Sequence, residues 1–413
     1  MSKDLDVQSD SVPRQHVFIV GAKGLANYGG FETFVDKLVE CHQDDQDIQY
    51  HVACKANGIA SMDESKLDGA QVINDHEFMY HNAHCFKVHV SDKIGSAQAI
   101  TYDMKALDYC IDYVREHQIN HPIVYILACR IGPVMGHYRK KLKKLGFTIY
   151  LNPDGHEWAR AKWNAVVRKY WKVSEGLMVK NADLAICDSV TIEQYIQTEY
   201  AKYHPNTTYI SYGSVIAPSP LSDDDPKFTG WLAEHNLAVK EYYLIVGRFV
   251  PENSFETIIK EFMNSKSEKS LAIITTADER FMSELQERLQ FQNDPRINFV
   301  GTVYDQPLLK KIREQAYGYI HGHTVGGTNP SLLEALGSTD LNLLINVGFN
   351  KEVGKDAALY WSAHPGSLSA LIDQCDGLDA ETIQDYADKA KQRIRDAYSW
   401  AFIADEYAKV FKK

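Results

Sequence analysis

Short apolar runs alternate with helical patterns along almost the whole chain, and this alternation limits the possible folds more than any other feature. Between the runs, apolar residues recur at three- and four-residue intervals, as at Phe31, Phe34 and Val35, which indicates helices. Strands that alternate with helices predict a parallel sheet covered by helices on both faces. In the first half of the chain, the runs that predict buried strands are residues 16–21, 50–53, 85–90, 123–127, 148–151 and 184–187.

A second series of strands and helices follows a segment rich in proline, serine and aspartate, residues 205–226. We interpret its consecutive aspartates as a solvated turn and not as a metal site. The sequence therefore predicts an α/β chain of two doubly wound, Rossmann-like domains, over residues 15–210 and 211–394, behind a flexible tail at 1–14. The strand runs of the second series are residues 242–246, 271–275, 297–300, 317–320 and 342–347.

Composition excludes several classes of protein. A chain of 413 residues with 45% hydrophobic content can bury two large cores, and a formal net charge of -11 disfavours a general nucleic-acid binder. The seven cysteines form no CxxC pair, which fits a reducing cytoplasm. No apolar run approaches ~18 residues, and residues 1–14 lack the apolar segment of a secretion signal. We therefore expect a cytoplasmic protein with no membrane-spanning helix.

A strand, a glycine turn and a helix start follow one another at residues 317–336. Gly326 and Gly327 allow backbone to approach a ligand closely, and Asn329 is a predicted N-cap with Pro330 at the first helical position. Free N–H groups at a helix start bind anions, so we predict a phosphate site here. Glu334, one turn into the helix, suits hydroxyl groups such as those of a ribose. A tight turn with an ordinary helix cap is the alternative interpretation.

Arg248 follows the strand at residues 242–246, so it opens on the same sheet edge as the glycine turn. Ligands of such sheets bind at the carboxyl ends of the strands. An arginine beside a helix start is a natural clamp for a diphosphate.

The first domain has two candidate ligand loops. Tyr28, Gly29, Gly30 and Phe31 lie in a glycine-rich loop that has neither the P-loop pattern nor the GxGxxG spacing. The second loop begins with Asp154 at the carboxyl end of the 148–151 strand and continues through polar and aromatic residues to position 163. For each loop, a plain turn or capped helix start is the alternative.

Two basic segments, residues 137–144 and 160–180, flank the second loop, and Trp163, Tyr170 and Trp171 are interleaved with them. Such a face binds anionic lipid surfaces, at ~1 kcal/mol per basic residue near the headgroups. A solvated charged helix is the alternative. The histidines at 76, 81, 84 and 89 match no standard zinc spacing, so we expect no metal there.

Four segments taken together resemble a known family. They are residues 21–24 with 28–33, residues 154–163 (DGHEWARAKW), residues 247–253 (GRFVPEN) and residues 326–335 (GGTNPSLLEA). The chain resembles GT-B glycosyltransferases of family 4 over nearly its whole length. Within them it is most similar to bacterial rhamnosyltransferases of cell-wall and capsular polysaccharide assembly. The C-terminal helix, residues 395–413, resembles the family's last helix, which crosses back onto the first domain.

The resemblance implies two domains facing each other across a cleft, with a nucleotide-sugar donor, dTDP-L-rhamnose, on the second domain. Arg248 matches the family's diphosphate-binding arginine and Glu334 its ribose-binding glutamate. We assign donor binding to these two residues and to the following: Asn253, Gly326, Gly327, Thr328 and Asn329.

The acceptor implied by the resemblance is a lipid diphosphate-linked sugar on the first domain. We assign its binding to residues of the two first-domain loops: Tyr28, Gly29, Gly30, Phe31, Glu157 and Arg160. The resemblance also implies that the basic aromatic face lies on the inner surface of the cell membrane.

Our hypothesis is a retaining rhamnosyltransferase that needs no metal and no other cofactor. Arg248 stabilises the charge on the leaving diphosphate, and Asp154 orients sugar or acceptor hydroxyls. Position 326, where the family carries the first of its paired glutamates, is glycine. Three alternatives therefore stay open: a transferase with a UDP-hexose donor, a nucleotide-sugar epimerase of the same fold, and a non-catalytic partner that binds nucleotide sugar.

Overall fold

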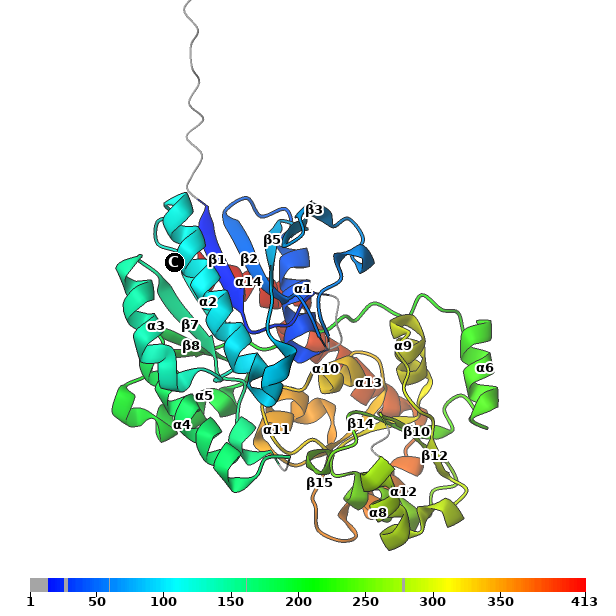
Figure 1. The fold of residues 1–413 in the computed structure, drawn as a ribbon. Helices are drawn as coiled ribbons and strands as arrows, with labels where there is room; N and C mark the ends of the chain where they lie inside the picture. Colours follow the sequence, from blue (N-terminus) through cyan, green and yellow to red (C-terminus); the bar gives the residue numbers. More distant parts are fainter. Residues whose placement is uncertain (1–13, 26–28, 59, 161, 277–278) are drawn as a thin grey trace, which may run out of the picture.

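Two parallel-stranded sheets, each flanked by helices, form the two lobes of the chain (Figure 1). This computed structural model describes residues 14–25, 29–58, 60–160, 162–276 and 279–413. The first sheet has the order β3-β4-β5-β2-β1-β6-β7-β8-β9. Its strands are β1 (Gln15–Val20), β2 (Ile48–Lys55), β3 (Gln71–Asn74), β4 (Glu77–Tyr80), β5 (Ala83–Val88), β6 (Ile123–Leu127), β7 (Thr148–Asn152), β8 (Leu184–Cys187) and β9 (Thr207–Tyr209).

The second sheet is parallel throughout, with the order β12-β11-β10-β13-β14-β15. Its strands are β10 (Tyr242–Val246), β11 (Ser270–Ile274), β12 (Ile297–Phe299), β13 (Gly318–His321), β14 (Leu341–Ile345) and β15 (Leu359–Trp361). The central strands β10, β13 and β14 are buried along almost their whole length, which is why they read as unbroken apolar runs.

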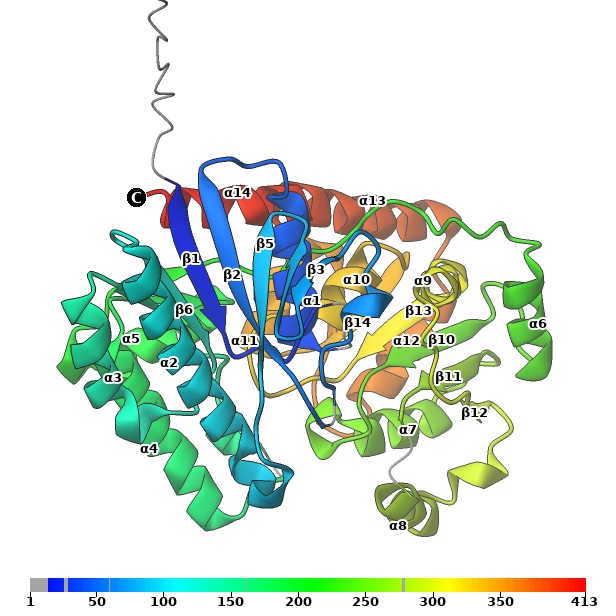
Figure 2. The same ribbon diagram turned by 45° about the horizontal axis from the view of Figure 1, so that its top comes forward.

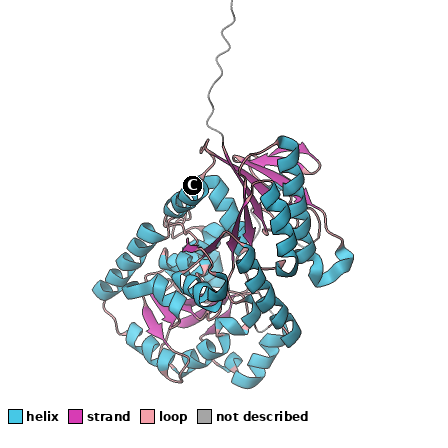
Figure 3. Cartoon of the chain, turned by 90° about the vertical axis from the view of Figure 1, so that its left-hand side faces the viewer, coloured by secondary structure: helices cyan, strands magenta, loops and turns pink. Residues whose placement is uncertain are grey.

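The helices cover both faces of the sheets (Figure 3). In the first lobe they are α1 (Gly30–Cys41), α2 (Gln98–His117), α3 (Gly132–Lys144), α4 (Ala165–Asn181) and α5 (Val190–Glu199). In the second lobe and at the C-terminus they are α6 (Pro226–Glu234), α7 (Phe255–Asn264), α8 (Glu279–Leu289), α9 (Gln306–Gln315), α10 (Pro330–Leu336), α11 (Gly348–Gly354), α12 (Ser367–Asp376), α13 (Ala380–Ala397) and α14 (Trp400–Phe411).

The first sheet departs from the predicted all-parallel pattern at one edge. There β3 and β4 form an antiparallel hairpin, and β4 pairs antiparallel with β5. All four residues of β3 are exposed, so no buried run marks this strand in the sequence. The short strands β9 and β15 were also not predicted, because each has only three residues and is at most partly buried over most of its length.

The chain passes twice between the lobes. The first passage is the linker from β9 to α6, and the second is the turn from α13 to α14 (Figure 2). The two passages meet where the Ser214 N–H donates to the Tyr398 carbonyl at 2.7 Å. Helix α14 then packs on α1, and Tyr407 and Phe411 enter the core of the first lobe.

An apolar cluster joins the lobes close to the predicted ligand loops. Leu332, Leu333 and Leu336 of α10 belong to the same buried cluster as Phe34 and Tyr125 of the first lobe. The N-terminal part of α10 is therefore held against the first domain. Among the described residues, no helix is long and apolar enough to cross a membrane.

Candidate active site

Loops after β10 and β13 lie side by side at the carboxyl edge of the second sheet, where ligands of doubly wound folds bind. Both the N–H and the hydroxyl of Thr324 donate to the Glu252 carbonyl, each at 2.9 Å. The Ser254 hydroxyl donates to the Gly322 carbonyl at 2.8 Å. From the next loop, the Asn350 amide donates to the His323 carbonyl at 3.1 Å. These bonds fix the loops as one unit.

Asn253, a predicted donor-binding residue, lies inside this unit. Its amide nitrogen donates to the Arg248 carbonyl at 2.7 Å, and its amide oxygen lies 2.8 Å from Nδ1 of His323. Both polar ends of Asn253 are thus engaged within the protein. The structure places it as a brace for Arg248 and His323.

The charges of two arginines from opposite domains act on His323. Arg248 comes from the loop after β10 and is exposed, whereas the Arg160 side chain comes from the first domain and is 15% exposed. Burial, and next the charges of Arg160 and Arg248, lower the pKa of His323 to about 4. Two cations that act on a neutral imidazole form an arrangement in which an anion such as a diphosphate could bind.

The glycine turn meets the first domain. Gly326 has a φ of 115°, a conformation that favours glycine. A Cβ on Gly327 would lie 1.8 Å from Oδ1 of Asp188, a residue that follows β8. The Thr328 hydroxyl donates to the Asp188 carbonyl at 2.8 Å. Gly327 is therefore required for close contact with protein, in addition to any contact with a ligand.

The predicted cap of α10 is present, but the prediction of free N–H groups behind it is wrong. The Asn329 side chain accepts from the Ser331 N–H at 2.9 Å, and the Asn329 carbonyl accepts from the N–H groups of Leu332 and Leu333. Pro330 has no N–H to offer. The cap satisfies the donors of the first turn, so the positive charge at this edge comes from arginine side chains.

Glu334 faces a partner that the sequence did not indicate. Its carboxylate is 41% exposed and forms an ion pair of 2.6 Å with Arg313 of α9, whose side chain is 4% exposed. Arg313 holds one carboxylate oxygen, while the Glu334 side chain stays partly exposed. The ribose-binding role of Glu334 stays a prediction.

Asp154 lies in a sharply turned loop after β7. Asp154 and His156 have φ values of 65° and 50°, and Gly155 has 110°. The Asn152 side chain accepts from the Asp154 N–H at 2.8 Å and supports the turn. Burial raises the pKa of Asp154, while Arg160 lowers it. A Cβ on Gly155 would lie 3.8 Å from the Gly326 backbone, so this loop packs close to the glycine turn.

Glu157 and Arg160 of the predicted acceptor site form an ion pair with each other. Lys162 also lies 3.0 Å from Glu157, and the Trp163 indole donates to the same carboxylate at 3.0 Å. Glu157 therefore orients Arg160 and the aromatic loop, and its carboxylate is largely occupied.

The glycine-rich loop of the first domain ends in α1. Gly29 is the N-cap of α1, with Gly30 and Phe31 in its first turn, and Tyr28 lies outside the described residues. The Glu32 side chain folds back and accepts from the Lys23 N–H at 3.0 Å. A Cβ on Gly29 would lie 1.9 Å from that carboxylate, so glycine is needed there for packing.

Arg130 is a further charged residue near Asp154 that sequence reasoning missed. It follows β6, forms a 3.2 Å ion pair with the fully buried Asp103, and donates to the Gly21 carbonyl at 3.1 Å. Its charge also acts on Asp154. The signal available in the sequence was its position directly after a strand, at the edge where Asp154 also lies.

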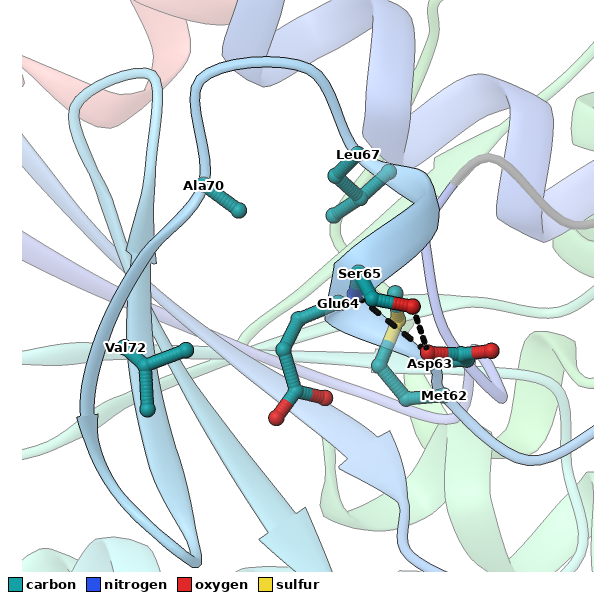
Figure 4. Close-up of a pocket in the computed structure, with 7 residues that line it drawn as sticks. All are labelled: Met62, Asp63, Glu64, Ser65, Leu67, Ala70 and Val72. Atoms are coloured by element: carbon teal, nitrogen blue, oxygen red, sulfur yellow. Dashed lines mark hydrogen bonds between the residues drawn. The ribbon is translucent and has the colours of Figure 1, made fainter.

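Two hollows lie away from the cleft. One, of about 400 Å³, lies between η1 (Glu64–Lys66) and β3 at the outer edge of the first sheet, where Ser65 bonds to Asp63 (Figure 4). The other, of about 640 Å³, we call the histidine groove. In it Nδ1 of His16 lies 2.9 Å from Nε2 of His51, and Nδ1 of His51 lies 3.1 Å from Nδ1 of His84.

The described residues contain no group of three or more His, Cys, Asp or Glu arranged to hold a metal ion. His84, one of the histidines weighed for metal binding in the sequence, is engaged with His51. Neither hollow is lined by residues of the loops after β7, β10 and β13, and these loops remain the candidate active site.

One family model matches the chain. It is a domain of unknown function, DUF1972, and it matches residues 14–215. A comparison with curated proteins finds no match.

Solved structures resemble the chain over almost its whole length. Sucrose-phosphate synthase from Thermosynechococcus elongatus has 16% identity and a TM-score of 0.75, over 97% of this chain and 98% of that chain. Anabaena HepE in complex with UDP has 14% identity and a TM-score of 0.68, over 96% and 99%. The E. coli trehalose-6-phosphate protein bound with UDP-2-fluoro glucose has 10% identity and a TM-score of 0.72, over 97% and 99%. The chain therefore has the GT-B fold, and the predicted fold class is confirmed.

Proposed function

We propose that this protein is a glycosyltransferase that takes a sugar from a nucleoside diphosphate sugar bound in the cleft. The observation that carries the proposal is that the charges of Arg160 and Arg248, from opposite domains, both act on His323, which lies on the loop of the Gly326–Gly327 turn. A nucleotide sugar has two negative phosphates followed by hydroxyls, and this cleft offers cations followed by carboxyl groups. UDP and UDP-2-fluoro glucose bound in structures of the same fold also support it.

The proposed mechanism uses fixed charges. Arg248 and Arg160 stabilise the negative charge that grows on the leaving diphosphate as the bond to the sugar breaks. The acceptor hydroxyl attacks from the leaving-group face, which gives retention, and a phosphate oxygen takes its proton. Asp154 orients hydroxyl groups of the sugar or acceptor. The arginines supply the positive charge, so the reaction is proposed to proceed without a metal.

Two donors are candidates, and each has its own support. The motif resemblance supports dTDP-L-rhamnose. The UDP-containing neighbours support a UDP-hexose. In either case the proposed partner of the nucleoside sugar is Glu334, whose side chain is 41% exposed.

The proposed acceptor is a lipid diphosphate-linked saccharide presented at a membrane surface. Helices α3 and α4 pack together, and the solvent side of α4 carries Val166 and Val173, which are 78% and 50% exposed, with Arg168 and Lys169 between them. Such a mixture of basic and apolar residues suits an anionic membrane interface. Several other basic side chains nearby form ion pairs with acids; for example, Arg139 pairs with Asp183 at 3.0 Å.

A transfer assay tests the proposed function. The full chain is incubated with a chelator, with dTDP-L-rhamnose or UDP-glucose, and with a synthetic lipid-diphosphate N-acetylglucosamine acceptor, and products are weighed by mass spectrometry. A deoxyhexose adduct supports the first donor and a hexose adduct the second. Conversion of the donor with no acceptor present would instead favour an epimerase. Binding of a nucleotide sugar with no turnover would favour a non-catalytic partner.

The membrane contact has a separate test. The chain should co-sediment with anionic vesicles at low salt and dissociate at high salt, because exposed charges are screened. The variant Arg168→Glu/Lys169→Glu should bind less, whereas Arg115→Glu, on the exposed side of α2, should bind like the wild type. Failure of the wild type to sediment with anionic vesicles would remove the membrane contact and leave the transferase proposal standing.

A further inference from the structure

A second acidic residue of the first domain lies directly beneath the glycine turn. Asp188 follows β8 and is 4% exposed. Its carboxyl group lies against Gly327, where a Cβ would come within 1.8 Å of Oδ1, and its carbonyl accepts from the Thr328 hydroxyl at 2.8 Å. The two middle residues of the turn thus rest on a single residue of the opposite domain.

The surroundings of this carboxyl group contain no cation that pairs with it among the described residues. The acids that act on it are Asp154 from the loop after β7 and Glu352 from α11. Oδ1 has no hydrogen-bond partner among the described residues. The other titratable or polar groups that face it from the elements packed around it are Cys187 of β8, Ser189 at the start of α5, Tyr125 of β6, Tyr212 of the linker, Tyr407 of α14 and Thr328.

A charged carboxylate in this place would be buried, without a cationic partner and close to two further acids, and hydrogen bonds from the Ser189 side chain and the Thr328 backbone offset this cost in part. Proteins avoid such a charge by keeping the group protonated. Burial, and next the charge of Asp154, raise the pKa of Asp188 well above its ordinary value. The geometry and the charge balance therefore agree on a neutral carboxylic acid.

We propose that Asp188 is a positioning residue whose uncharged carboxyl group seats Gly327 and Thr328 of the donor loop against the first domain. The proposal rests on the proposed function, since that function assigns the turn to the donor. Ionisation of Asp188 would set its charge against Asp154 and Glu352 and displace its carboxyl group from its contact with Gly327. The kcat/KM for the donor would then fall at high pH.

Three variants test the contact. Asp188→Asn keeps the shape and cannot ionise, and its carbonyl still accepts from Thr328. It should keep kcat/KM within about threefold of wild type at neutral pH, and its kcat/KM should no longer fall at high pH. Asp188→Ala removes the support and should lower kcat/KM by about 100-fold, the scale expected when a binding group is misplaced by an ångström. Glu199→Gln is the matched control and should behave as wild type, because Glu199 is exposed at the end of α5, the helix that follows Asp188.

A double variant tests the contact independently of pH. Gly327→Ala places a methyl group against Oδ1 of Asp188 and should impair nucleotide-sugar binding. In Gly327→Ala/Asp188→Ala the clash is removed, so binding should recover at least tenfold over Gly327→Ala alone. Calorimetry with UDP-glucose and dTDP-L-rhamnose gives this readout without an acceptor. Equal binding by the single and double variants would overturn the proposal.

The remaining outcomes are separable. Wild-type protein that binds no nucleotide sugar contradicts the proposed function itself. The role of Asp188 alone is overturned if the wild type transfers sugar but its kcat/KM does not fall at high pH. It is also overturned if Asp188→Asn is folded and as inactive as Asp188→Ala. Thermal unfolding of each variant shows whether it is folded, and Asp188→Asn carries the test if Asp188→Ala is not.

Discussion

Replacing Arg160 by alanine should lower transfer activity while leaving the fold intact. Arg160 belongs to the first domain, yet its charge acts on His323 of the second. Its side chain is 15% exposed, and solvent screens it less than a surface arginine. Its partner Glu157 would keep Lys162 at 3.0 Å, so the substitution does not leave a buried carboxylate unpaired.

The size of the effect follows from the charge that Arg160 faces. A fixed donor aimed at charge that grows in the transition state contributes about 3–4 kcal/mol when removed from a water-poor site. About 1.4 kcal/mol corresponds to a factor of ten, so kcat/KM should fall by about 100-fold or more. Arg248→Ala should fall by a similar factor. Each substitution should also raise the pKa of His323, because a nearby cation that opposes protonation is lost.

The assay is steady-state transfer with whichever donor the wild type uses, with Arg115→Ala as the control because Arg115 is 64% exposed on α2. Histidine NMR titration reports the pKa of His323 in the same variants. If Arg160→Ala keeps kcat/KM within twofold of wild type while remaining folded, the two arginines do not form one site.

Three further results are expected. Asp103→Ala leaves the buried Arg130 without its counterion and should lower the free energy of unfolding by about 3–5 kcal/mol, measured by urea denaturation. Asp112→Ala, in an exposed pair on the same helix, should lower it by under about 1 kcal/mol. Equal losses would contradict the assigned burial. Burial lowers the pKa values of the three hydrogen-bonded histidines of the histidine groove, so the unfolded chain takes up protons first as the pH falls. Stability should therefore fall as pH drops below about 6.5, which urea midpoints from pH 8 to 5 would show. If the slope of stability against pH is unchanged after all three are replaced by glutamine, these histidines are not its cause. Glu334→Gln should weaken nucleotide binding measured by calorimetry, since it trades a charged acceptor for a neutral one and unpairs the arginine beside it; unchanged affinity would remove Glu334 from the nucleoside site.

The fold could be predicted because its signals are local and repeated. The run Tyr242–Val246 is the strand β10 to the residue, since a central parallel strand is apolar on both faces. The N-cap at Asn329 followed from residue type alone. The hairpin of β3 and β4 could not be predicted in the same way, because its exposed edge has no apolar period.

The site was only partly predictable, because its chemistry depends on contacts between distant segments. Asn329, Arg248 and Asp154 could be selected from their positions after strands. The pairing of Glu334 with Arg313 and the contact of Gly327 with Asp188 join residues that no local pattern connects. The cap at Asn329 also occupies the N–H groups that a sequence motif alone suggests are free.

The most direct test of the cross-cleft diphosphate site is a calorimetric comparison of UDP, dTDP and their monophosphates on the wild type and on Arg160→Ala/Arg248→Ala. We predict that the wild type binds at least one diphosphate far more tightly than its monophosphate. We also predict that the double variant loses this preference while its residual affinity for the monophosphate is unchanged. Equal affinity of the wild type for monophosphate and diphosphate, or a preference that survives in the double variant, would contradict a diphosphate site formed by Arg160 and Arg248.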